Sequence, residues 1–382
     1  MKYSLTVAAL ATMAEAARPY LEVPDTGYYD AVDVAAGMLP DIESIVGLND
    51  FQLAAENYLP ITNFTYYRNG AGGEWSYRNN LEVYNRFRFS PRVMNDITGV
   101  GATAATTILG HNFSSPIFIS PAARADYAHP DAELNLVRAA GAQEVLYITS
   151  SYAAKAWEDI AAEDIPGQVR WQQVYFSQNA TANLELLARA EATNASAAVW
   201  AVDSPGSPSR ERAARFGVGS ANTAFVTNTW DVYATYRNST KLPIVLKGIQ
   251  SVKDARAAVD HGVPAIILSN HGGRNLDGSP SSLEVALEIY QEDPDIFNQI
   301  EVLADGGVRY GTDALKLMAL GVKAVGIGRP AMFSNVYGQP GVEKMLSILK
   351  EQIVNDAAGL GVADLKKINA SYVKWQNNGW YS

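Results

Sequence analysis

Residues 242–273 read LPIVLKGIQSVKDARAAVDHGVPAIILSNHGG and contain two apolar runs of strand type separated by a helical stretch. The two runs are Leu242–Leu246 and Pro264–Leu268. Between them, the apolar residues of Val252–His261 recur at helical spacing, and a glycine follows the end of that stretch. A strand, a helix and a second strand in this order predict a βαβ unit, which joins parallel strands.

The same alternation extends through the rest of the chain from about residue 115. Strand-type runs are predicted at Pro116–Ser120, Val145–Thr149, Val169–Tyr175, Ala197–Val202, Leu242–Leu246, Pro264–Leu268, Ile300–Leu303 and Ala324–Ile327. Helices are predicted between them at Ala132–Ala140, Asn183–Glu191, Val252–His261 and Asp313–Leu320. Eight such strands predict an α/β fold, the (β/α)₈ TIM barrel. A doubly wound open sheet is the alternative, since periodicity does not show which strands close.

The chain before this alternation divides into three parts. Residues 1–16 have a basic start, an apolar stretch and the sequence Ala14-Glu-Ala16, which predict a secretory signal peptide. An amphipathic N-terminal helix is the alternative. Residues 17–41 form an acidic arm, and Asp50–Tyr67 is predicted to be helical. We therefore expect one barrel domain over residues 42–375, preceded by a helical segment.

Six N-glycosylation sequons accompany the predicted leader. They begin at Asn63, Asn112, Asn179, Asn194, Asn238 and Asn369. Together with the leader they predict a secreted, N-glycosylated protein.

Composition excludes several kinds of chemistry. The 382 residues carry 30 Lys and Arg against 40 Asp and Glu, a net charge of −10, which argues against nucleic acid and anionic membranes as partners. No later apolar run is long enough to cross a membrane. The absence of Cys excludes disulfides and thiolate chemistry, and only four His remain for a metal site, so we expect no metal.

Polar residues stand at or just after the ends of the predicted strands. They are Gln173, Tyr175, Asp203, Lys247, Ser269-Asn-His271, Asp305 and Arg329. In a barrel these ends meet on the rim where active sites are built. Two late glycine turns, Asp305-Gly-Gly-Val-Arg309 and Gly326-Ile-Gly-Arg-Pro330, predict a phosphate site, and neither matches a dinucleotide fingerprint or a P-loop.

The segment Ser269-Asn-His-Gly-Gly-Arg-Asn-Leu-Asp277 resembles the signature of the FMN-dependent 2-hydroxy acid oxidase/dehydrogenase family. That family includes glycolate oxidase, lactate oxidase, lactate monooxygenase and flavocytochrome b2. Further motifs stand in the family's order at Tyr66–Ala71, Ser120–Ala123, Gln173–Tyr175, Val202-Asp203, Lys247-Gly248, Asp305–Arg309 and Gly328-Arg329. The resemblance implies bound FMN as the cofactor.

The resemblance also implies catalytic roles. His271 is similar to the base that removes a proton from the substrate, and Asp203 to the carboxylate that orients it and stabilises its charged form. Tyr175 is similar to the hydroxyl donor at the reacting oxygen. Lys247 is similar to the lysine whose charge stabilises reduced flavin.

Substrate and cofactor contacts follow from the same resemblance. Arg274 and Arg210 are similar to the pair that binds the substrate carboxylate, with Tyr66 and Tyr152 beside them; for Arg210, a solvated charged stretch is the alternative. The FMN-binding positions are Pro121, Ala122, Ala123, Ser150, Gln173, Lys247, Ser269, Asp305, Gly306, Gly307, Arg309, Gly328 and Arg329.

Three departures affect specificity. Tyr152 replaces the Trp of glycolate oxidase, as in lactate oxidase and lactate monooxygenase, which places the chain nearest that branch. Asn275 stands where Gln is usual. The stretch Phe216–Trp230 is shorter than the family's mobile loop, so substrates bulkier than lactate are expected to enter.

The activity implied is oxidation of an L-2-hydroxy acid to the 2-keto acid, with O₂ as acceptor and H₂O₂ as product. A dehydrogenase, or a monooxygenase with another fate of the reduced flavin, is the alternative. Hydride and carbanion routes use the same residues. Electron transfer to a haem domain is disfavoured because no His precedes residue 110. The family further implies a homotetramer.

Overall fold

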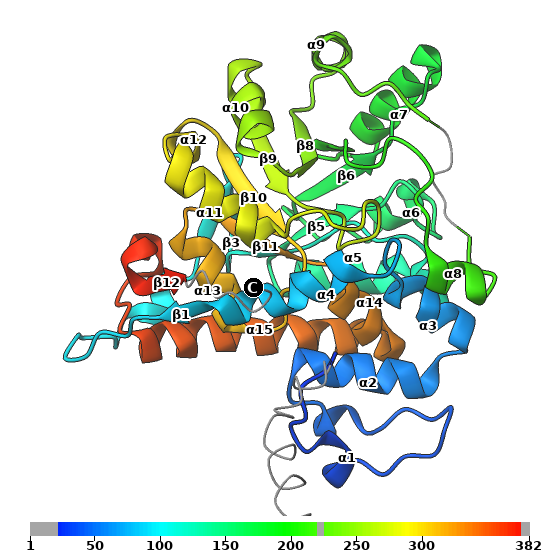
Figure 1. The fold of residues 1–382 in the computed structure, drawn as a ribbon. Coiled ribbons are helices and arrows are strands. Elements are labelled where there is room, and N and C mark those ends of the chain that lie inside the picture. Colours follow the sequence, from blue (N-terminus) through cyan, green and yellow to red (C-terminus); the bar gives the residue numbers. More distant parts are fainter. Residues whose placement is uncertain (1–21, 220–224, 376–382) are drawn as a thin grey trace, which may run out of the picture.

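A closed barrel of eight parallel strands forms the centre of the computed structural model, which describes residues 22–219 and 225–375 (Figure 1). Around the barrel the order is β4 (Ile117–Ile119), β5 (Leu146–Thr149), β6 (Arg170–Val174), β7 (Ala198–Ala201), β8 (Ile244–Ile249), β9 (Ala265–Leu268), β10 (Glu301–Asp305) and β11 (Ala324–Ile327). Strand β11 pairs with β4 and closes the ring. The predicted (β/α)₈ barrel is confirmed, and each of its eight strands overlaps a predicted run.

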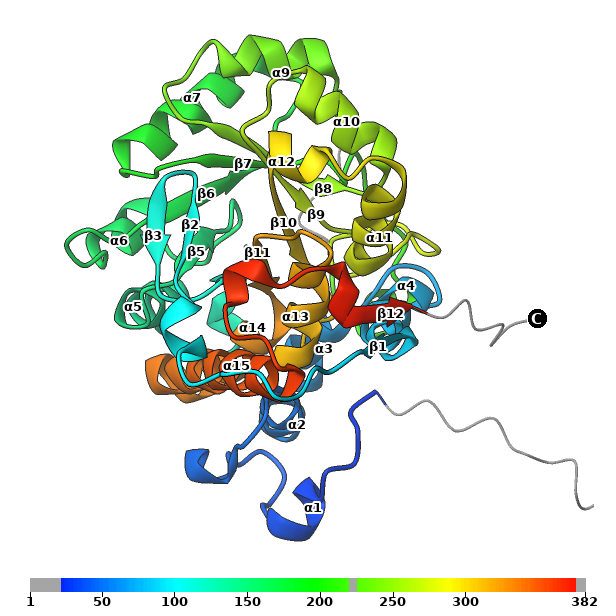
Figure 2. The same ribbon diagram turned by 90° about the vertical axis from the view of Figure 1, so that its left-hand side faces the viewer.

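The inside of the barrel is filled by apolar side chains from alternate positions of the strands. Phe118, Leu146, Ile148 and Trp171 belong to this cluster and are completely buried. A hairpin of β2 (Thr106–Ile108) and β3 (His111–Phe113) precedes β4 and adds Ile108 and Phe113 to the same cluster. The hairpin therefore closes the barrel at the end opposite the carboxyl ends of the strands (Figure 2).

Helices surround the barrel and bury their apolar faces against the outside of the strands (Figure 2). They are α5 (Glu133–Ala142), α6 (Trp157–Ala162), α7 (Ala180–Ala192), α9 (Trp230–Arg237), α10 (Val252–Asp260), α11 (Ser282–Glu292), α12 (Ile296–Gln299), α13 (Gly311–Ala319), α14 (Arg329–Ser334) and α15 (Gly338–Leu360). The short α8 (Glu211–Arg215) lies instead against the chain that precedes the barrel. The four predicted helices correspond to α5, α7, α10 and α13. No helix of the described residues is both long enough and apolar enough to cross a membrane.

The segment before the barrel packs beside it rather than forming a separate unit. Its elements are α1 (Tyr28–Ala31), α2 (Leu48–Tyr58), α3 (Ile61–Arg68), α4 (Trp75–Glu82) and β1 (Phe87–Phe89), which pairs with β12 (Val373–Trp375). The predicted helical segment is divided into α2 and α3, because Pro60 lacks an N–H and stands at the start of α3. The predicted signal peptide lies outside the described residues.

Strand β8 continues past the predicted end at Leu246. Its pairing with β9 shifts register between Lys247 and Ile249, and Gly248 adopts a φ of 109° at the shift. A Cβ on Gly248 would lie 2.5 Å from the side chain of Asp203. A glycine is therefore required where β8 passes this carboxylate.

Candidate active site

One pocket opens at the carboxyl ends of the barrel strands, where the sequence places the polar residues. Every residue predicted for the site lines this pocket except Asp203 and Ser269. These two lie immediately behind it, because Asp203 contacts His271 and Ser269 contacts Lys247. The structure thus brings the predicted catalytic, substrate and cofactor residues together.

Lys247 is held in the floor of the pocket by a buried polar network. Its Nζ donates to Ser269 Oγ at 2.9 Å and lies 3.2 Å from Asp305 Oδ2. Asp305 also accepts hydrogen bonds from Ser269 Oγ (2.6 Å) and Ser120 Oγ (2.9 Å). Lys247 and Asp305 are 4% and 6% exposed, so each charge needs the other. Lys247 therefore supplies a fixed positive charge to the pocket.

His271 and Asp203 form a pair between the ends of β9 and β7, in which the His271 side chain stays partly exposed. His271 Nδ1 lies 2.9 Å from Asp203 Oδ1, and the carboxylate is completely buried. With Nδ1–H donated to Asp203, the Nε2 atom is left as an acceptor in the pocket, 3.3 Å from the Tyr175 hydroxyl. This arrangement suits a base that removes a proton from a molecule in the pocket.

Burial and neighbouring charges set the protonation of this pair. Burial lowers the pKa of His271, and the charge of Asp203 only partly offsets that effect. Burial acts against ionisation of Asp203 as well, but His271 and Lys247 hold its pKa below the ordinary value. At neutral pH the imidazole is consequently neutral and the carboxylate charged, which is the state a proton acceptor requires.

Two arginines reach the pocket without a carboxylate partner among the described residues. Arg274 donates through Nη1 to the carbonyls of Tyr66 (2.9 Å) and Tyr67 (3.2 Å). Arg210 donates through Nε to the Arg274 carbonyl at 2.8 Å. Burial, followed by the charge of Arg210, lowers the pKa of Arg274 to about 10. An anion bound between the two guanidinium groups would relieve this excess of positive charge.

Aromatic side chains form the wall next to these arginines. The rings of Tyr152 and Tyr175 are stacked, with centroids 5.4 Å apart. Tyr152 is 37% exposed and lies at the entrance, whereas burial raises the pKa of Tyr175 and keeps its hydroxyl protonated. Burial raises the pKa of Tyr66 as well. Both hydroxyls are therefore available as donors in the pocket.

The two glycine turns lie at the other end of the pocket. A Cβ on Gly307 would stand 1.8 Å from the Asn80 carbonyl oxygen, and φ at Gly307 is 80°. The backbone of Gly328 and the side chain of Arg309 border the same space. The Arg329 guanidinium, in contrast, donates to the carbonyls of Tyr67 (2.8 Å), Gly272 and Asn69 (both 2.9 Å). Its side chain thus joins the pre-barrel segment to the His271 turn.

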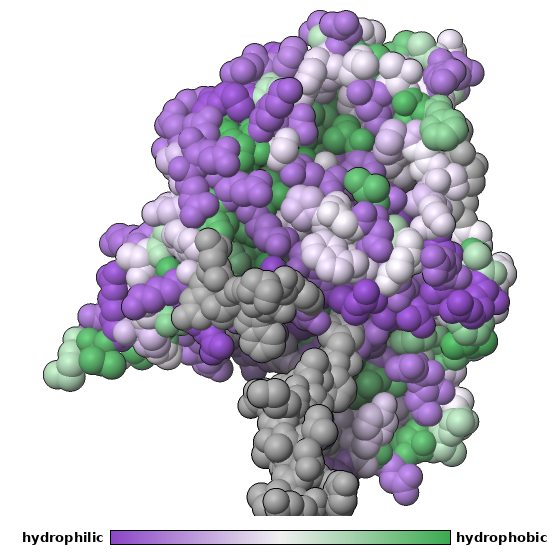
Figure 3. Space-filling model, viewed as in Figure 1, coloured by the Kyte–Doolittle hydropathy of each residue, from purple (hydrophilic) through white to green (hydrophobic). Residues whose placement is uncertain are grey.

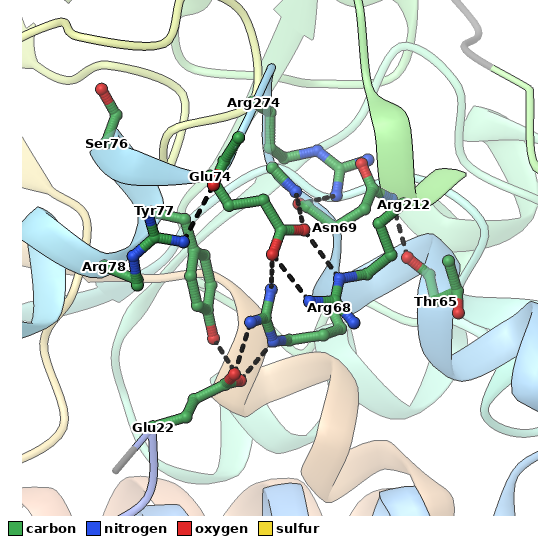
Figure 4. Close-up of polar contacts among 12 residues, drawn as sticks. Glu22, Thr65, Arg68, Asn69, Glu74, Ser76, Tyr77, Arg78, Arg212 and Arg274 are labelled. Atoms are coloured by element: carbon green, nitrogen blue, oxygen red, sulfur yellow. Dashed lines mark hydrogen bonds and ion pairs between the residues drawn. The ribbon is translucent and has the colours of Figure 1, made fainter. Parts of the chain in front are cut away.

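A network centred on Glu74 was not predicted from the sequence (Figure 4). Glu74 accepts two hydrogen bonds of 2.8 Å from Arg212 and lies 3.2 Å from Arg68 Nη1. Arg68 also pairs with Glu22 of the acidic arm, which accepts a hydrogen bond from the Tyr77 hydroxyl at 2.8 Å. The only signal was the charged stretch Arg210-Glu-Arg212, in which the Arg212 side chain stays 40% exposed while its guanidinium contacts Glu74.

The stretch of chain just before α4, residues 69–74, anchors both loops that carry the pocket arginines. The Ala71 amide donates to the Gly273 carbonyl, and the Gly72 amide donates to the Ser209 carbonyl, each at 2.8 Å. Gly273 precedes Arg274 and Ser209 precedes Arg210 in the chain. Residues 69–74 therefore position both guanidinium groups from outside the barrel.

Known proteins match most of the chain. The family model described as FMN-dependent dehydrogenase matches residues 55–228 and 219–375. Glycolate oxidase of Spinacia oleracea is 33% identical, over 86% of this chain and 95% of its own. The cytochrome-type L-lactate dehydrogenase of Wickerhamomyces anomalus is 31% identical over 86% of this chain, which spans only 61% of that relative.

Solved structures agree with these matches. A flavocytochrome b2 variant with benzoylformate superposes with a TM-score of 0.84 at 33% identity, covering 88% of both chains. A mandelate oxidase structure gives a TM-score of 0.79 at 35% identity, covering 87% of this chain and 99% of that one.

Proposed function

The chain belongs to the FMN-dependent dehydrogenase family, and we propose that it oxidises an L-2-hydroxy acid to the 2-keto acid with O₂ as electron acceptor. In that reaction the hydroxy acid loses two electrons and two protons, and O₂ gains them to become H₂O₂. The observation that carries the proposal is the convergence in one pocket of the His271–Asp203 pair, the unpaired Arg210 and Arg274, and the buried Lys247.

The residues of the pocket fit FMN. Gln173 Nε2 is a buried donor without a partner among the described residues, and its side chain lines the pocket. Lys247 offers a positive charge, and Gly328 borders open space in the pocket, since a Cβ on it would have no atom within 4 Å. Gly307, Gly328 and Arg309 would hold the phosphate, and Gln173 and Lys247 the ring. Bound FMN supplies the two-electron acceptor that no side chain of this chain provides.

The protein's own residues bind and orient the substrate. Arg274 and Arg210 would bind its carboxylate, because a planar guanidinium matches two carboxylate oxygens. That position brings the substrate hydroxyl toward His271 Nε2 and the Tyr175 hydroxyl. His271 takes the proton on Nε2, and Asp203 stabilises the resulting imidazolium through Nδ1–H.

The test is reduction of the FMN-loaded protein without oxygen. Addition of L-lactate, glycolate or L-mandelate should bleach the visible flavin band, whereas D-lactate should not. The variant His271→Gln should retain FMN and lose at least about 10²-fold in turnover. His129→Gln, which changes a histidine outside the pocket, is the matched control and should remain active. A wild-type protein that no 2-hydroxy acid bleaches contradicts the proposal.

The acceptor is tested separately. One H₂O₂ per 2-keto acid identifies the oxidase that we propose. Reduced flavin that reacts slowly with O₂ but rapidly with an added dye would identify a dehydrogenase. Release of the decarboxylated acid and water would identify a monooxygenase.

The half-exposed Tyr152 supports a proposal about substrate size. It lines the pocket beside Tyr175 and is 37% exposed. We therefore propose that 2-hydroxy acids with an aromatic side chain are accepted, and expect a higher kcat/KM for L-mandelate than for L-lactate.

We further propose that the protein is exported and N-glycosylated and that it assembles as a homotetramer. Five of the six sequon asparagines are exposed, which supports glycan attachment; Asn63 is half-buried, and its Nδ2 donates to the Tyr127 carbonyl. Recovery from the culture medium, a mass decrease on endoglycosidase treatment and light scattering test these three statements.

A further inference from the structure

Asn275 lies beside the two arginines of the pocket and contacts one of them. Its Oδ1 atom accepts a hydrogen bond from Arg210 Nη2 at 3.3 Å. Its Nδ2 atom donates to the backbone carbonyl of Asp203 at 3.0 Å. Because a guanidinium can only donate and a carbonyl can only accept, one orientation of the amide satisfies both partners. The Asp203 carbonyl thus fixes the amide so that its oxygen faces Arg210.

The two arginines are held in different ways. Arg274 donates through Nη1 to three backbone carbonyls of residues 66–69, at 2.9 to 3.4 Å. Arg210 has two hydrogen bonds within the described part of the chain. Its Nε donates to the Arg274 carbonyl at 2.8 Å, and its Nη2 donates to Asn275. The orientation of the Arg210 guanidinium therefore depends on the side chain at position 275.

Both acceptors of Arg210 are uncharged. An amide oxygen orients a guanidinium without cancelling its charge, whereas a carboxylate in the same place would form an ion pair with it. The molecule shows this contrast two residues further along, where Arg212 donates two hydrogen bonds to the carboxylate of Glu74. A neutral residue at position 275 therefore leaves the charge of Arg210 for an anion in the pocket.

Open space borders Asn275. It lines the active-site pocket and also a second cavity, of about 570 Å³, behind Asp203. The lining of the second cavity is mostly apolar and includes Val202, Phe225 and Leu246. Figure 3 shows hydrophobic surface (green) recessed below the position of α9 between hydrophilic residues (purple). A side chain longer by one methylene therefore has room at position 275, and a shorter one leaves no closed void.

We propose that Asn275 is a positioning residue for substrate binding. Its neutral amide holds the Arg210 guanidinium toward the pocket with its charge intact, and thereby sets the preference of the site for a carboxylate over an uncharged group. The inference rests on the proposed function, in which Arg210 and Arg274 bind the substrate carboxylate. It also gives a task to a position where the family usually has Gln, which carries the same amide on a longer side chain.

The experiment compares the binding of pyruvate and pyruvamide to the oxidised, FMN-loaded protein by calorimetric titration at pH 7.5. Pyruvate is the 2-keto acid that corresponds to L-lactate, and pyruvamide is its uncharged amide. We expect the wild-type protein to bind pyruvate at least about 10-fold more tightly than pyruvamide. Equal affinity of the wild-type protein for the two compounds would overturn the proposal.

Variants of Asn275 separate charge from structure. Asn275→Asp is nearly isosteric but places a carboxylate against Arg210, so the affinity for pyruvate should fall at least about 30-fold while that for pyruvamide changes less than about threefold. Asn275→Ala removes the hydrogen bond without adding charge and should bind pyruvate roughly 3- to 10-fold more weakly. Asn275→Gln keeps the amide and should stay within about threefold of wild type. Equal weakening of both ligands in Asn275→Asp would indicate a merely structural residue and contradicts the proposal.

Asn57→Asp is the matched control. Asn57 also donates through Nδ2 to backbone carbonyls, those of Ala35 and Met38, but it does not line the pocket. This variant carries the same added charge and should bind pyruvate like wild type.

The result can be told apart from a failure of the proposed function. A protein that L-lactate bleaches, and whose Asn275→Asp variant keeps the preference for pyruvate, contradicts only the positioning role. A protein that no 2-hydroxy acid bleaches contradicts the proposed function, and the titrations with pyruvate and pyruvamide still decide the role of Asn275.

Discussion

His271 combines a backbone conformation that is uncommon outside glycine with a side-chain pair to the buried Asp203. Its φ is 59°, and Gly272 and Gly273 continue the turn at 65° and 73°. The turn is held by Asn270, whose Oδ1 accepts from the Gly273 amide and whose Nδ2 donates to Asn80. A non-glycine residue in this region costs about 1–3 kcal/mol, so the fold maintains it through these bonds. The result is an imidazole in one orientation.

Replacing Asp203 by Asn tests how the base is tuned. The carboxylate raises the pKa of His271 against the larger effect of burial, so its loss should lower that pKa further. Because only neutral imidazole accepts a proton, the acid limb of the pH profile of kcat/KM should move to lower pH. We also expect kcat to fall about 10²-fold or more, since the ring loses its orientation. A limb that stays in place or moves to higher pH contradicts this role.

Gly307 tests the cofactor end of the pocket. In Gly307→Ala the new methyl group would meet the Asn80 carbonyl at 1.8 Å with an unfavourable positive φ. FMN should bind at least about 10-fold more weakly, measured by quenching of flavin fluorescence. Gly99→Ala, where nothing lies within 4 Å, is the control and should bind FMN normally. Equal affinity in both variants would show that the turn after β10 does not shape the site.

At the level of elements, the pocket depends on segments that the sequence does not show to be neighbours. The predicted strands and helices follow from local periodicity, but the bulge in β8 lies where the strand passes Asp203, just after β7. Likewise Glu74 immediately precedes α4, with a φ of 65°, and meets Arg212 of α8 only in the folded chain. Tertiary packing decides which charged residues pair, so this network could not be predicted from the sequence.

Glu74→Gln should destabilise the protein because it leaves Arg68 buried without one of its carboxylates. Although burial opposes ionisation, Arg212 and Arg68 lower the pKa of Glu74 from 4.5 to about 2. The resulting stabilisation, about 3 kcal/mol, is present above the unfolded pKa and is lost as the pH falls from about 4.5 to 2. Urea unfolding at pH 7 should show a loss of this order, and the variant should depend less on pH in that window.

The control for Glu74 is Glu158→Gln. Glu158 also accepts two hydrogen bonds from one arginine, Arg189, but both side chains are largely exposed. Solvent screens such pairs, so this variant should unfold nearly as wild type does. Equal losses in the two variants would mean that burial of the Glu74 network is unimportant. We also expect a higher KM only in Glu74→Gln, because segment 69–74 positions Arg210 and Arg274.

In the whole molecule, the apolar residues that close the barrel and the polar residues of the active site lie at opposite ends of the barrel axis. The β2–β3 hairpin fills one end with Ile108 and Phe113, and the polar residues occupy the other. Binding of FMN at the carboxyl ends of the strands should therefore depend little on the packing at the end that the β2–β3 hairpin closes.

Ile108→Ala tests that separation. Ile108 is completely buried, so its truncation should cost about 2–5 kcal/mol of unfolding free energy while KM and FMN affinity stay within about twofold. Thr107→Ala, on the exposed side of the same strand, should change stability by less than about 0.5 kcal/mol. A large change in KM for Ile108→Ala at a temperature where it is folded would contradict the separation.

The amino-acid sequence by itself predicted the eight strands and the polar residues at their ends, because both are local properties. The roles of the site residues followed from the resemblance to a family and stay predictions, and the closure of the strands into a barrel was decided by the tertiary structure. Spacing also identified the two glycine turns. Only the tertiary structure decided that Arg329 binds backbone carbonyls, that Glu74 contacts Arg212 near the arginine loops, and that a second cavity lies behind Asp203. These features depend on which side chains burial brings together, and the partner of a buried charge is chosen by packing between segments far apart in the chain.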